Sequence, residues 1–297
     1  MTDAPISARG VARPEQRHSG AVRLFRRFPI SAMVAGIVLL AYVTIAVFAP
    51  IISPYSPTDI FVGSPFEPPS SLYLLGTDNL GRDVLSRVIY GSRTILLMAG
   101  SAAGLSALIG GLLGMQLGYR GGLVDEIAMR ILEIIMSIPS IIFALLIVGI
   151  LGASAPLVTF TVGLLSVPNV TRVVRAATQS VVAEEFVTAA RARGETSLSI
   201  VLREILPNVA GTLIVEFSIR TGYAILFIGG LGFLGFGAQP PTPDWGLMVN
   251  EGRGMIDASI WPVVSPAVCM AALVTAVNLF TDGIMRIFGP AERGRIS

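Results

Sequence analysis

Long apolar stretches without charges alternate with short polar segments along this 297-residue chain. A helix crosses a bilayer core with about 20 apolar residues. The run from Ile134 to Thr171 has 38 residues without a charge, too long for one span, so we expect it to turn back at Gly152 to Pro156. The pattern predicts an all-α, polytopic membrane protein with six transmembrane helices. The expected spans are residues 29–49, 94–119, 127–151, 156–174, 209–231 and 260–281.

Arginine is spread unevenly over the segments between these spans. Alternate segments, starting with the N-terminal one, hold 15 arginines, whereas the other segments hold four although they are longer. Because cytoplasmic loops carry the excess of basic residues, we expect both termini in the cytoplasm. The expected organisation is a cytoplasmic tail 1–28, a first span with an extracytoplasmic loop 29–93, a transmembrane core 94–287 that includes a cytoplasmic segment 184–208, and a cytoplasmic tail 288–297.

The composition excludes several classes of function. The chain is 53% hydrophobic and 13% charged, with a mean hydropathy of +0.75. All 21 basic residues are arginine, so the chain has no P-loop lysine and no lysine nucleophile. The only histidine is His18, which excludes a Ser-His-Asp triad and an HExxH zinc site, and the single cysteine, Cys269, cannot form a disulfide within the chain. We therefore expect no enzymatic activity, no bound cofactor or metal and no nucleic-acid partner, with ATP and Mg²⁺ used by another protein.

A polar segment, residues 184–208, separates the fourth and fifth expected spans. Glycine permits a sharp turn at Gly194, and proline lacks the amide that a helix would need at Pro207. We expect two short helical runs, hinged at Gly194 and stopped at Pro207. The residues alone fit a docking elbow for a soluble partner and a solvated amphipathic loop equally well.

The spacing of small residues in this segment resembles the EAA loop of ABC-importer permeases. Ala189-Ala190, Gly194 and Leu206-Pro207 match that pattern, while Thr188 and Glu204 replace its Glu and Ile. In that family the first short helix lies in a groove of the ATPase subunit, which implies that Ala189 and Ala190 allow close approach. The implied ATPase-coupling residues are Glu185, Ala189, Ala190, Arg191, Arg193, Gly194, Leu206 and Pro207.

Two further segments resemble the dipeptide, oligopeptide and nickel branch of these permeases. Residues 75–93 are similar to the entry of its second span, and residues 233–253 to the external loop before its last span. The resemblance runs from residue 28 to the C-terminus and is strongest to the C-type, or second, permease of dipeptide and oligopeptide systems. It implies a type I importer fold and di- or oligopeptide uptake by alternating access in the bacterial inner membrane. The implied partners are a homologous permease, one or two P-loop ATPase subunits and an extracytoplasmic substrate-binding protein.

Two groups of polar residues are candidates for contact with cargo or partners. Asp78, Arg82, Asp83 and Trp245 are candidates for the extracytoplasmic entrance or for contact with a binding protein, although a carboxylate before a helix fits a structural cap at least as well. Glu216, Arg220 and Asn278, inside expected spans, are candidates for the translocation path.

Three charge pairs have spacings that place both members on one helix face. They are Arg130 with Glu133, Glu216 with Arg220, and Asp282 with Arg286. Mutual neutralisation is the simpler interpretation for each pair, and we expect the first and third to reach the cytoplasm.

Two alternative functions remain at this point, and one motif is rejected by its context. Nickel or nickel-chelate import shares the same motifs. A gradient-driven secondary transporter or a channel would show inverted repeats or an intramembrane chain of acids, and the sequence shows neither. The pattern GxGxxG at Gly230 to Gly235 follows an apolar span instead of a strand, which argues against a dinucleotide site.

Overall fold

The computed structural model describes residues 29–288 as a bundle of helices, with no strand in that range. The expected tails and His18 lie outside the described residues. The helices are α2 (Ile30–Ile52), α3 (Val84–Arg120), α4 (Gly122–Met136), α5 (Ser140–Leu151), α6 (Ala155–Val182), α7 (Glu185–Ala192), α8 (Ser197–Ile200), the π-helical turn η1 (Val201–Ile205), α9 (Leu206–Phe233), α10 (Trp245–Gly252), the 3₁₀ turn η2 (Arg253–Met255) and α11 (Trp261–Phe288).

Within residues 29–288, five continuous helical stretches are long and apolar enough to cross a membrane, and a sixth span is possible if α4 and α5 count as one. The expected span 127–151 is bent, which the sequence did not predict, because α4 and α5 meet at an angle of 78°. Pro139 has no amide hydrogen and disfavours helical backbone at the residue before it, so the helix ends at Met136. The predicted turn at Gly152 is confirmed, with a positive φ of 88° between α5 and α6.

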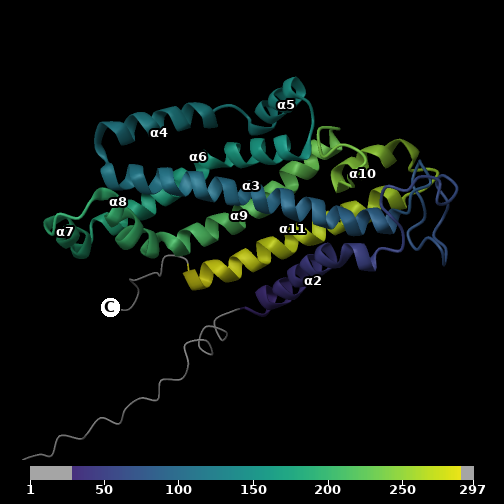
Figure 1. Ribbon diagram of the computed structural model, residues 1–297, viewed down its shortest axis with the longest axis horizontal. Coiled ribbons are helices and arrows are strands. Elements are labelled where there is room, and N and C mark those ends of the chain that lie inside the picture. Colours follow the sequence, from purple (N-terminus) through teal and green to yellow (C-terminus); the bar gives the residue numbers. More distant parts are fainter. Residues whose placement is uncertain (1–28, 289–297) are drawn as a thin grey trace, which may run out of the picture.

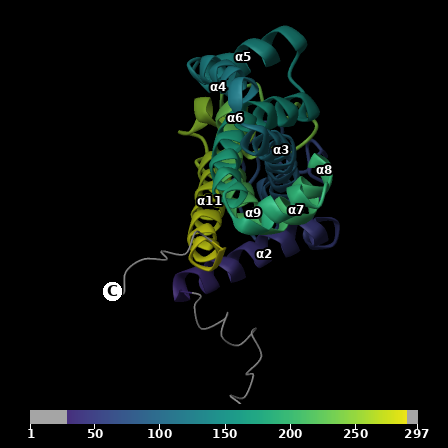
Figure 2. The same cartoon turned by 90° about the vertical axis from the view of Figure 1, so that its left-hand side faces the viewer.

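The helices α3 and α6 form the centre of the bundle (Figures 1 and 2). On one side they are flanked by α9, α11 and α2, and on the other by α4 and α5 (Figure 2). Glycines allow α3 and α6 to approach closely: a Cβ on Gly114 would lie 2.7 Å from the Thr171 carbonyl oxygen, and one on Gly118 would lie 2.8 Å from that of Arg175. Such small-residue contacts are typical of helix pairs in membranes.

Two hydrophobic clusters divide the core along the bundle. One includes Trp245 and the first half of α3, and the other includes Met115 and the buried side of α7. We call the corresponding ends of the molecule the α10 end and the α7 end, which lie at opposite ends of the long axis in Figure 1. The loop 53–83 packs at the α10 end, beside α10 and the start of α3 (Figure 1).

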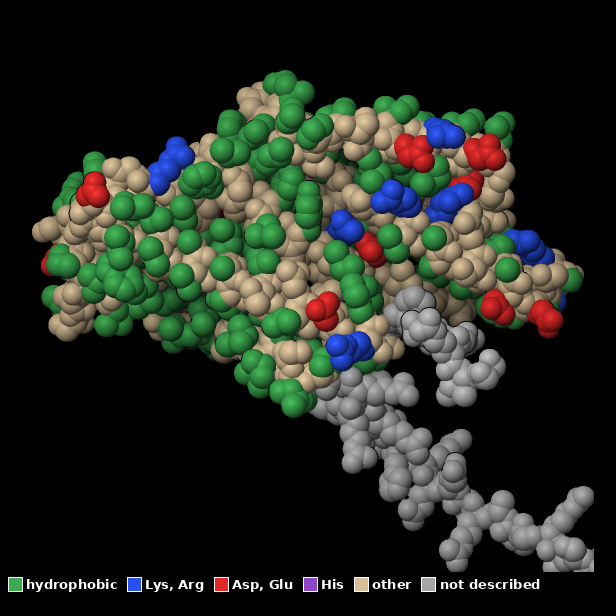
Figure 3. Space-filling view, turned by 180° about the vertical axis from the view of Figure 1, so that it is seen from behind, with side chains coloured by type: hydrophobic (Ala, Val, Ile, Leu, Met, Phe, Trp, Pro, Cys, Tyr) green, Lys and Arg blue, Asp and Glu red, His purple; other side chains and the backbone are tan. Residues whose placement is uncertain are grey.

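Hydrophobic and charged side chains occupy different parts of the surface. Figure 3 shows a broad hydrophobic area over much of the bundle, while most charged side chains on that face gather towards the α7 end. Large exposed hydrophobic residues are expected where a helix faces lipid or another apolar helix. The surface therefore agrees with a protein that spans a membrane.

Candidate functional site: an exposed elbow and a buried charge cluster

The predicted elbow at Gly194 is present and has a well-defined geometry. Gly194 has a φ of +77°, its amide donates to the Arg191 carbonyl over 3.0 Å, and the Glu195 amide donates to the Ala190 carbonyl over 3.3 Å. These two bonds form the Schellman motif, in which a left-handed residue, usually glycine, ends a helix. The turn therefore fixes the direction in which the chain leaves α7.

One side of α7 belongs to the core of the chain. Val187 and Ala190 are fully buried in the cluster at the α7 end, against residues of α3, α6 and α9. The expectation that both alanines allow close approach of a partner is therefore wrong for Ala190, since its methyl group already packs against its own chain. Ala189 is exposed. Glu185, Arg191, Arg193 and Gly194 are exposed beside it.

The second half of the elbow differs from the prediction. The chain does not stop at Pro207, because Ser197–Phe233 forms one continuous helical stretch. Pro207 lies in the first turn of α9, directly after the π-helical turn, and the Leu206 amide donates to the Val201 carbonyl five residues earlier. The wider turn lets the helix pass a residue that has no amide hydrogen. Leu206 is half-buried and Pro207 is exposed.

The charges of the elbow are arranged at its surface. Arg193 pairs with Glu195 over 2.7 Å, and 57% of the Arg193 side chain is exposed. The hydrogen bond from Arg193 holds the pKa of the Glu195 carboxyl below its usual range, although loss of water raises it in part. Arg191 lies over the Tyr119 ring at 4.7 Å, a cation–π contact that joins α7 to the end of α3. The elbow thus presents an ordered polar rim.

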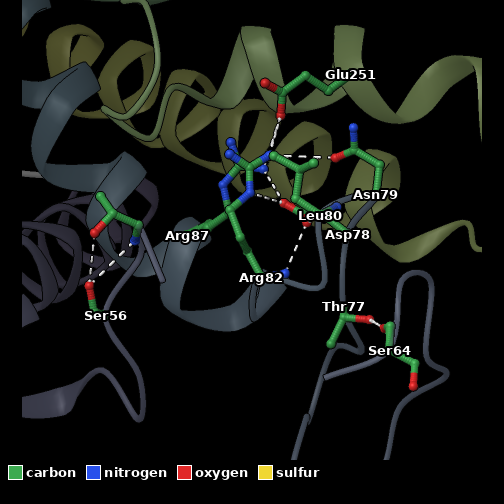
Figure 4. Close-up of polar contacts among 10 residues, drawn as sticks. Ser56, Ser64, Thr77, Asp78, Asn79, Leu80, Arg82, Arg87 and Glu251 are labelled. Carbon is green, nitrogen blue, oxygen red and sulfur yellow. Dashed lines mark hydrogen bonds and ion pairs between the residues drawn. The ribbon is translucent and has the colours of Figure 1, made fainter. Parts of the chain in front are cut away.

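Buried charges distinguish the α10 end. Asp78 accepts from Arg82 Nε over 2.6 Å and from Arg87 over 2.5 Å, and Glu251 accepts from the same two arginines over 2.9 and 3.0 Å. The side chains of Asp78, Arg82 and Arg87 are only 3–6% exposed. Figure 4 shows both arginines between the two carboxylates, which come from the loop before α3 and from α10. The cluster joins segments that are far apart in sequence.

The other two entrance candidates are also structural elements in this conformation. Asp83 caps α3, since its carboxylate accepts from the Ser86 amide over 2.8 Å. The Trp245 side chain is 1% exposed and donates from Nε1 to the Val88 carbonyl over 3.0 Å. Asp244 caps α10, and burial raises the pKa of this carboxyl against the opposing effect of amide donors such as Leu247. These residues hold α10 on α3 and offer little surface to a partner.

Comparison with known proteins decides the family. Residues 110–294 match the family model of the binding-protein-dependent transport system inner membrane component, and residues 21–69 match the N-terminal transmembrane domain of oligopeptide transport permease C. The chain belongs to this permease family.

Named relatives agree with that assignment. The permease is 36% identical to the dipeptide transport system permease protein DppC of Haemophilus influenzae, over 87% of this chain and 90% of the relative. It is 37% identical to the di/tripeptide transport system permease protein DppC of Pseudomonas aeruginosa, over 85% of each. It is 34% identical to the glutathione transport system permease protein GsiD of Escherichia coli, over 98% and 97%.

A solved structure of the MetNI methionine ABC transporter, in an inward-facing conformation, shares the fold of this permease. The TM-score is 0.55 at 20% identity, covering 68% of this chain and 96% of the other. At that level of identity the likeness concerns the fold alone.

Two of the three predicted charge pairs of this permease form in the structure, and the third does not. Arg220 donates from Nε to Glu216 over 3.2 Å within α9, and Asn278 of α11 lies against Gly222, two residues after Arg220. Arg130 donates to Glu133 over 3.1 Å at the surface of α4. Among residues 29–288, no ion pair joins Asp282 to Arg286, and both side chains are exposed, so the predicted mutual neutralisation of this pair was wrong.

A fourth pair was missed by sequence reasoning. Asp125 of α4 accepts from Arg175 of α6, over 2.5 Å at Nε and through a second bond from the terminal nitrogen. The Asp125 side chain is buried. The partners are 50 residues apart and lie on different helices, so no local spacing indicates them. Asp125 and Arg175 each lie just outside an expected span, 127–151 and 156–174, and only their position at the same expected end of two adjacent spans could have suggested the contact.

Proposed function

We propose that this permease is the transmembrane subunit of an ATP-binding-cassette importer for di- or oligopeptides in the bacterial inner membrane. Three named relatives that align over most of the chain are permeases of dipeptide, di/tripeptide and glutathione systems. All three cargoes are small peptides or a peptide-like molecule with charged ends. The chain itself catalyses no reaction and binds no cofactor, while a partner ATPase uses ATP and Mg²⁺.

The observation that carries the proposal is the exposed helix α7, ordered at its end by the Schellman turn. In the proposed assembly, α7 docks on a P-loop ATPase through Ala189 and the rim formed by Glu185, Arg191 and Arg193. A helix laid into a groove is a common mode of recognition. Both termini then lie in the cytoplasm together with α7. A homologous permease completes the pathway, and an extracytoplasmic binding protein delivers cargo at the α10 end.

The contacts of α7 explain how such docking would move the spans. Val187 and Ala190 pack against α3, α6 and α9 in one cluster, and α8 continues through η1 into α9 without a break. A displacement of α7 would therefore be passed on to several spans at once. Binding and hydrolysis of ATP by the partner would favour different packings of the bundle, and the pathway would open alternately to each side.

Inside the bundle, Glu216, Arg220 and Asn278 remain the proposed contacts for cargo in the pathway. Glu216 is buried and, among residues 29–288, its polar partner is Arg220, which bonds through Nε and is itself partly exposed. The terminal nitrogens of Arg220 are then available for a carboxylate, such as the C-terminus of a peptide. Ionisable residues inside membrane spans are rare and commonly mark solute or ion pathways, which supports a role for this pair beyond mutual neutralisation.

Uptake in whole cells tests the proposal. Cells that lack this gene, but keep the neighbouring transporter genes, are supplied with the permease and given a radiolabelled dipeptide or, in parallel, radioactive nickel. We expect dipeptide uptake to be restored and nickel uptake to be unchanged. Restoration of nickel uptake alone would overturn the peptide assignment and keep the importer assignment. Uptake that survives removal of the partner ATPase would overturn both.

A further inference from the structure

A groove lies on the surface of the bundle between α3 and α6, in the half of the molecule towards the α10 end. It has a volume of about 470 Å³ and is lined by side chains from residues 97–105 of α3 and 155–160 of α6. The lining is apolar apart from one serine and one threonine. Leu97 and Phe160, which belong to it, are 62% and 52% exposed. We call this cavity the α3–α6 groove.

The position of α3 in the membrane places the groove in one leaflet. Arg93 directly precedes the uncharged run 94–119, so it lies near a membrane surface, and Leu97 follows it by one helical turn. At about 1.5 Å per residue, the lining from Leu97 to Leu105 lies about 6–18 Å beyond Arg93 along α3. One leaflet of a hydrocarbon core about 30 Å thick has this depth.

Helix α6 gives the same depth independently. It begins at Ala155, directly after the turn at Gly152 that separates two expected spans. Close contacts between α3 and α6 advance together along both helices, from Ala102 with Gly163 to Gly118 with Arg175. The two helices therefore run in the same direction, and the first turns of α6 lie level with the lining of α3. Both helices start at the membrane surface on the α10 side.

A free positive charge lies at the surface end of the groove. The Arg93 side chain is exposed, and within residues 29–288 no carboxylate pairs with it. Arg82 and Arg87, earlier in the chain, are buried and paired with carboxylates. Arg93 and Leu97 are four residues apart, so they lie on the same side of α3. Because helical side chains lean towards the N-terminus, the Arg93 guanidinium reaches towards the headgroups above the groove.

The size of the groove favours a flexible apolar chain over a helix. A helix with its side chains is about 10–12 Å across, so along about 12 Å of α3 it would occupy about 900–1,400 Å³. This is roughly twice the volume of the groove or more. The groove does fall within the range of about 300–1,000 Å³ that is typical of small-molecule sites. Its apolar lining suits hydrocarbon, and a guanidinium suits phosphate.

We propose that the α3–α6 groove and Arg93 form a binding site for an anionic phospholipid, in the leaflet on the α10 side. The lipid phosphate contacts the Arg93 guanidinium, and one acyl chain lies between α3 and α6. Basic residues beside membrane helices hold anionic headgroups in this way. Met98 lines the groove and also belongs to the core cluster that includes Trp245, so a bound lipid would support the packing of the two central helices. The site is independent of the cargo.

Native mass spectrometry of the assembled transporter tests the headgroup contact. The complex is purified from its native membrane in mild detergent, stripped of lipid, and titrated with phosphatidylglycerol or with phosphatidylcholine that has the same acyl chains. Arg93→Gln removes the guanidinium. Arg253→Gln is the matched control, because Arg253 is an exposed arginine that follows α10 and lies over the Phe233 ring.

We expect the wild type and Arg253→Gln to bind one phosphatidylglycerol more tightly than phosphatidylcholine. Arg93→Gln should bind phosphatidylglycerol about fivefold more weakly, which corresponds to about 1 kcal/mol per basic residue near an anionic membrane surface. An unchanged affinity in Arg93→Gln, an equal loss in Arg253→Gln, or no preference for the anionic lipid in the wild type would overturn the proposal.

A second pair of variants tests the acyl-chain contact. Ser101→Trp fills the groove with a bulky side chain, and Leu226→Trp places the same side chain on α9, where Leu226 is 53% exposed. We expect Ser101→Trp to lose the tight lipid and Leu226→Trp to keep it. Tight binding that survives Ser101→Trp would contradict the placement of the chain in the groove.

Photolabelling of the unmodified complex covers variants that assemble poorly. Phosphatidylglycerol with a diazirine in its acyl chain is added to membranes that contain the transporter, and the adducts are mapped by mass spectrometry after irradiation. We expect adducts to concentrate in residues 97–105 and 155–160 and to be displaced by unlabelled phosphatidylglycerol. Equal labelling of exposed α2 residues such as Leu40 would indicate bulk lipid and overturn the proposal. An unlabelled groove in which Leu97→Cys cross-links to the partner permease would also overturn it and assign the groove to a protein interface.

Discussion

The two ends of the permease use charge in opposite ways. At the α10 end, Asp78, Arg82, Arg87 and Glu251 are packed against one another and almost withdrawn from solvent. At the α7 end, Arg193 and Glu195 are paired at the surface of a turn. Buried charges that lose a partner are strongly destabilising, whereas exposed pairs contribute little. Charge therefore holds the fold together at one end and offers a contact surface at the other.

The largest expected effect comes from removing one charge at the α10 end. Asp78→Asn removes the carboxylate that pairs with both Arg82 and Arg87 in a buried site and leaves Glu251 as their ion-pair partner, so we expect a loss of about 3–5 kcal/mol in the free energy of unfolding. Glu195→Gln at the α7 end is the matched change, and we expect no measurable loss. Thermal unfolding of both variants in the same detergent gives the comparison. A similar melting temperature for the two variants would contradict the distinction between the ends.

The same glycine substitution at each end gives the next largest effect. A Cβ on Gly91 would lie 2.5 Å from the Trp245 ring, so Gly91→Ala forces the packing of α10 apart and should cost about 1–3 kcal/mol of stability. A Cβ on Gly194 meets nothing within 4 Å, but the φ of +77° is unfavourable for alanine. Gly194→Ala should cost about 1 kcal/mol, concentrated in the turn.

Two readouts separate these glycine variants. Thermal unfolding should respond mainly to Gly91→Ala, while binding of the partner ATPase should respond mainly to Gly194→Ala. Gly194→Asn is the control for backbone strain, because asparagine tolerates the left-handed region better than alanine. If Gly194→Asn weakened ATPase binding as much as Gly194→Ala, strain would not be the cause.

The smallest expected effect concerns how local stability depends on pH. Its sign should differ between Glu195 at the α7 end and Asp244 at the α10 end. Glu195 has a lowered pKa, so its stabilisation is present above the ordinary carboxyl pKa and is lost as the pH falls through the lowered value. Asp244 has a raised pKa, so its charge disfavours the fold at neutral pH and that penalty is relieved as the pH falls through the raised value.

Hydrogen exchange measures both ends in one experiment. Each protein is compared at every pH with its own neutral variant, Glu195→Gln or Asp244→Asn, which removes the intrinsic pH dependence of exchange. Protection of the α7–α8 turn should fall relative to Glu195→Gln as the pH falls from the ordinary carboxyl pKa through the lowered pKa of Glu195. Protection of α10 should rise relative to Asp244→Asn as the pH falls from neutral through the raised pKa of Asp244. Changes of the same sign at both ends would show that the local charge environments do not differ as described.

Local sequence signals predicted the helices and the main turns, because each depends on neighbouring residues. The turn at Gly152 and the elbow at Gly194 both have the positive φ that glycine favours. The angle between α4 and α5 was missed because Pro139 was read as part of an apolar run, although its missing amide was visible in the sequence. Pro207 was wrongly predicted to end the helix, because a π-helical turn directly before it lets the helix continue.

Contacts between residues far apart in the chain could not be predicted from the sequence. Both ends are polar turns rich in glycine and charge, and nothing local distinguishes the buried set around Asp78 from the exposed set around Arg193. The partner Glu251 comes from 169 residues beyond Arg82, and Arg175 from 50 residues beyond Asp125. The burial of Ala190 also depends on α3, α6 and α9 together. Contacts with the ATPase, the cargo and the binding protein stay predictions.

The most direct test of the account is whether the exposed side of α7 binds an ATPase. The tagged permease is purified from its native membrane in mild detergent in three forms. They are the wild type, Ala189→Trp on the exposed side of α7, and Ala258→Trp, at an alanine that is also exposed, in the segment between α10 and α11. We expect a P-loop ATPase to accompany the wild type and Ala258→Trp, and to be lost from Ala189→Trp at unchanged melting temperature. Recovery of the ATPase with all three proteins, or with none of them, would contradict the role of α7 as its docking helix.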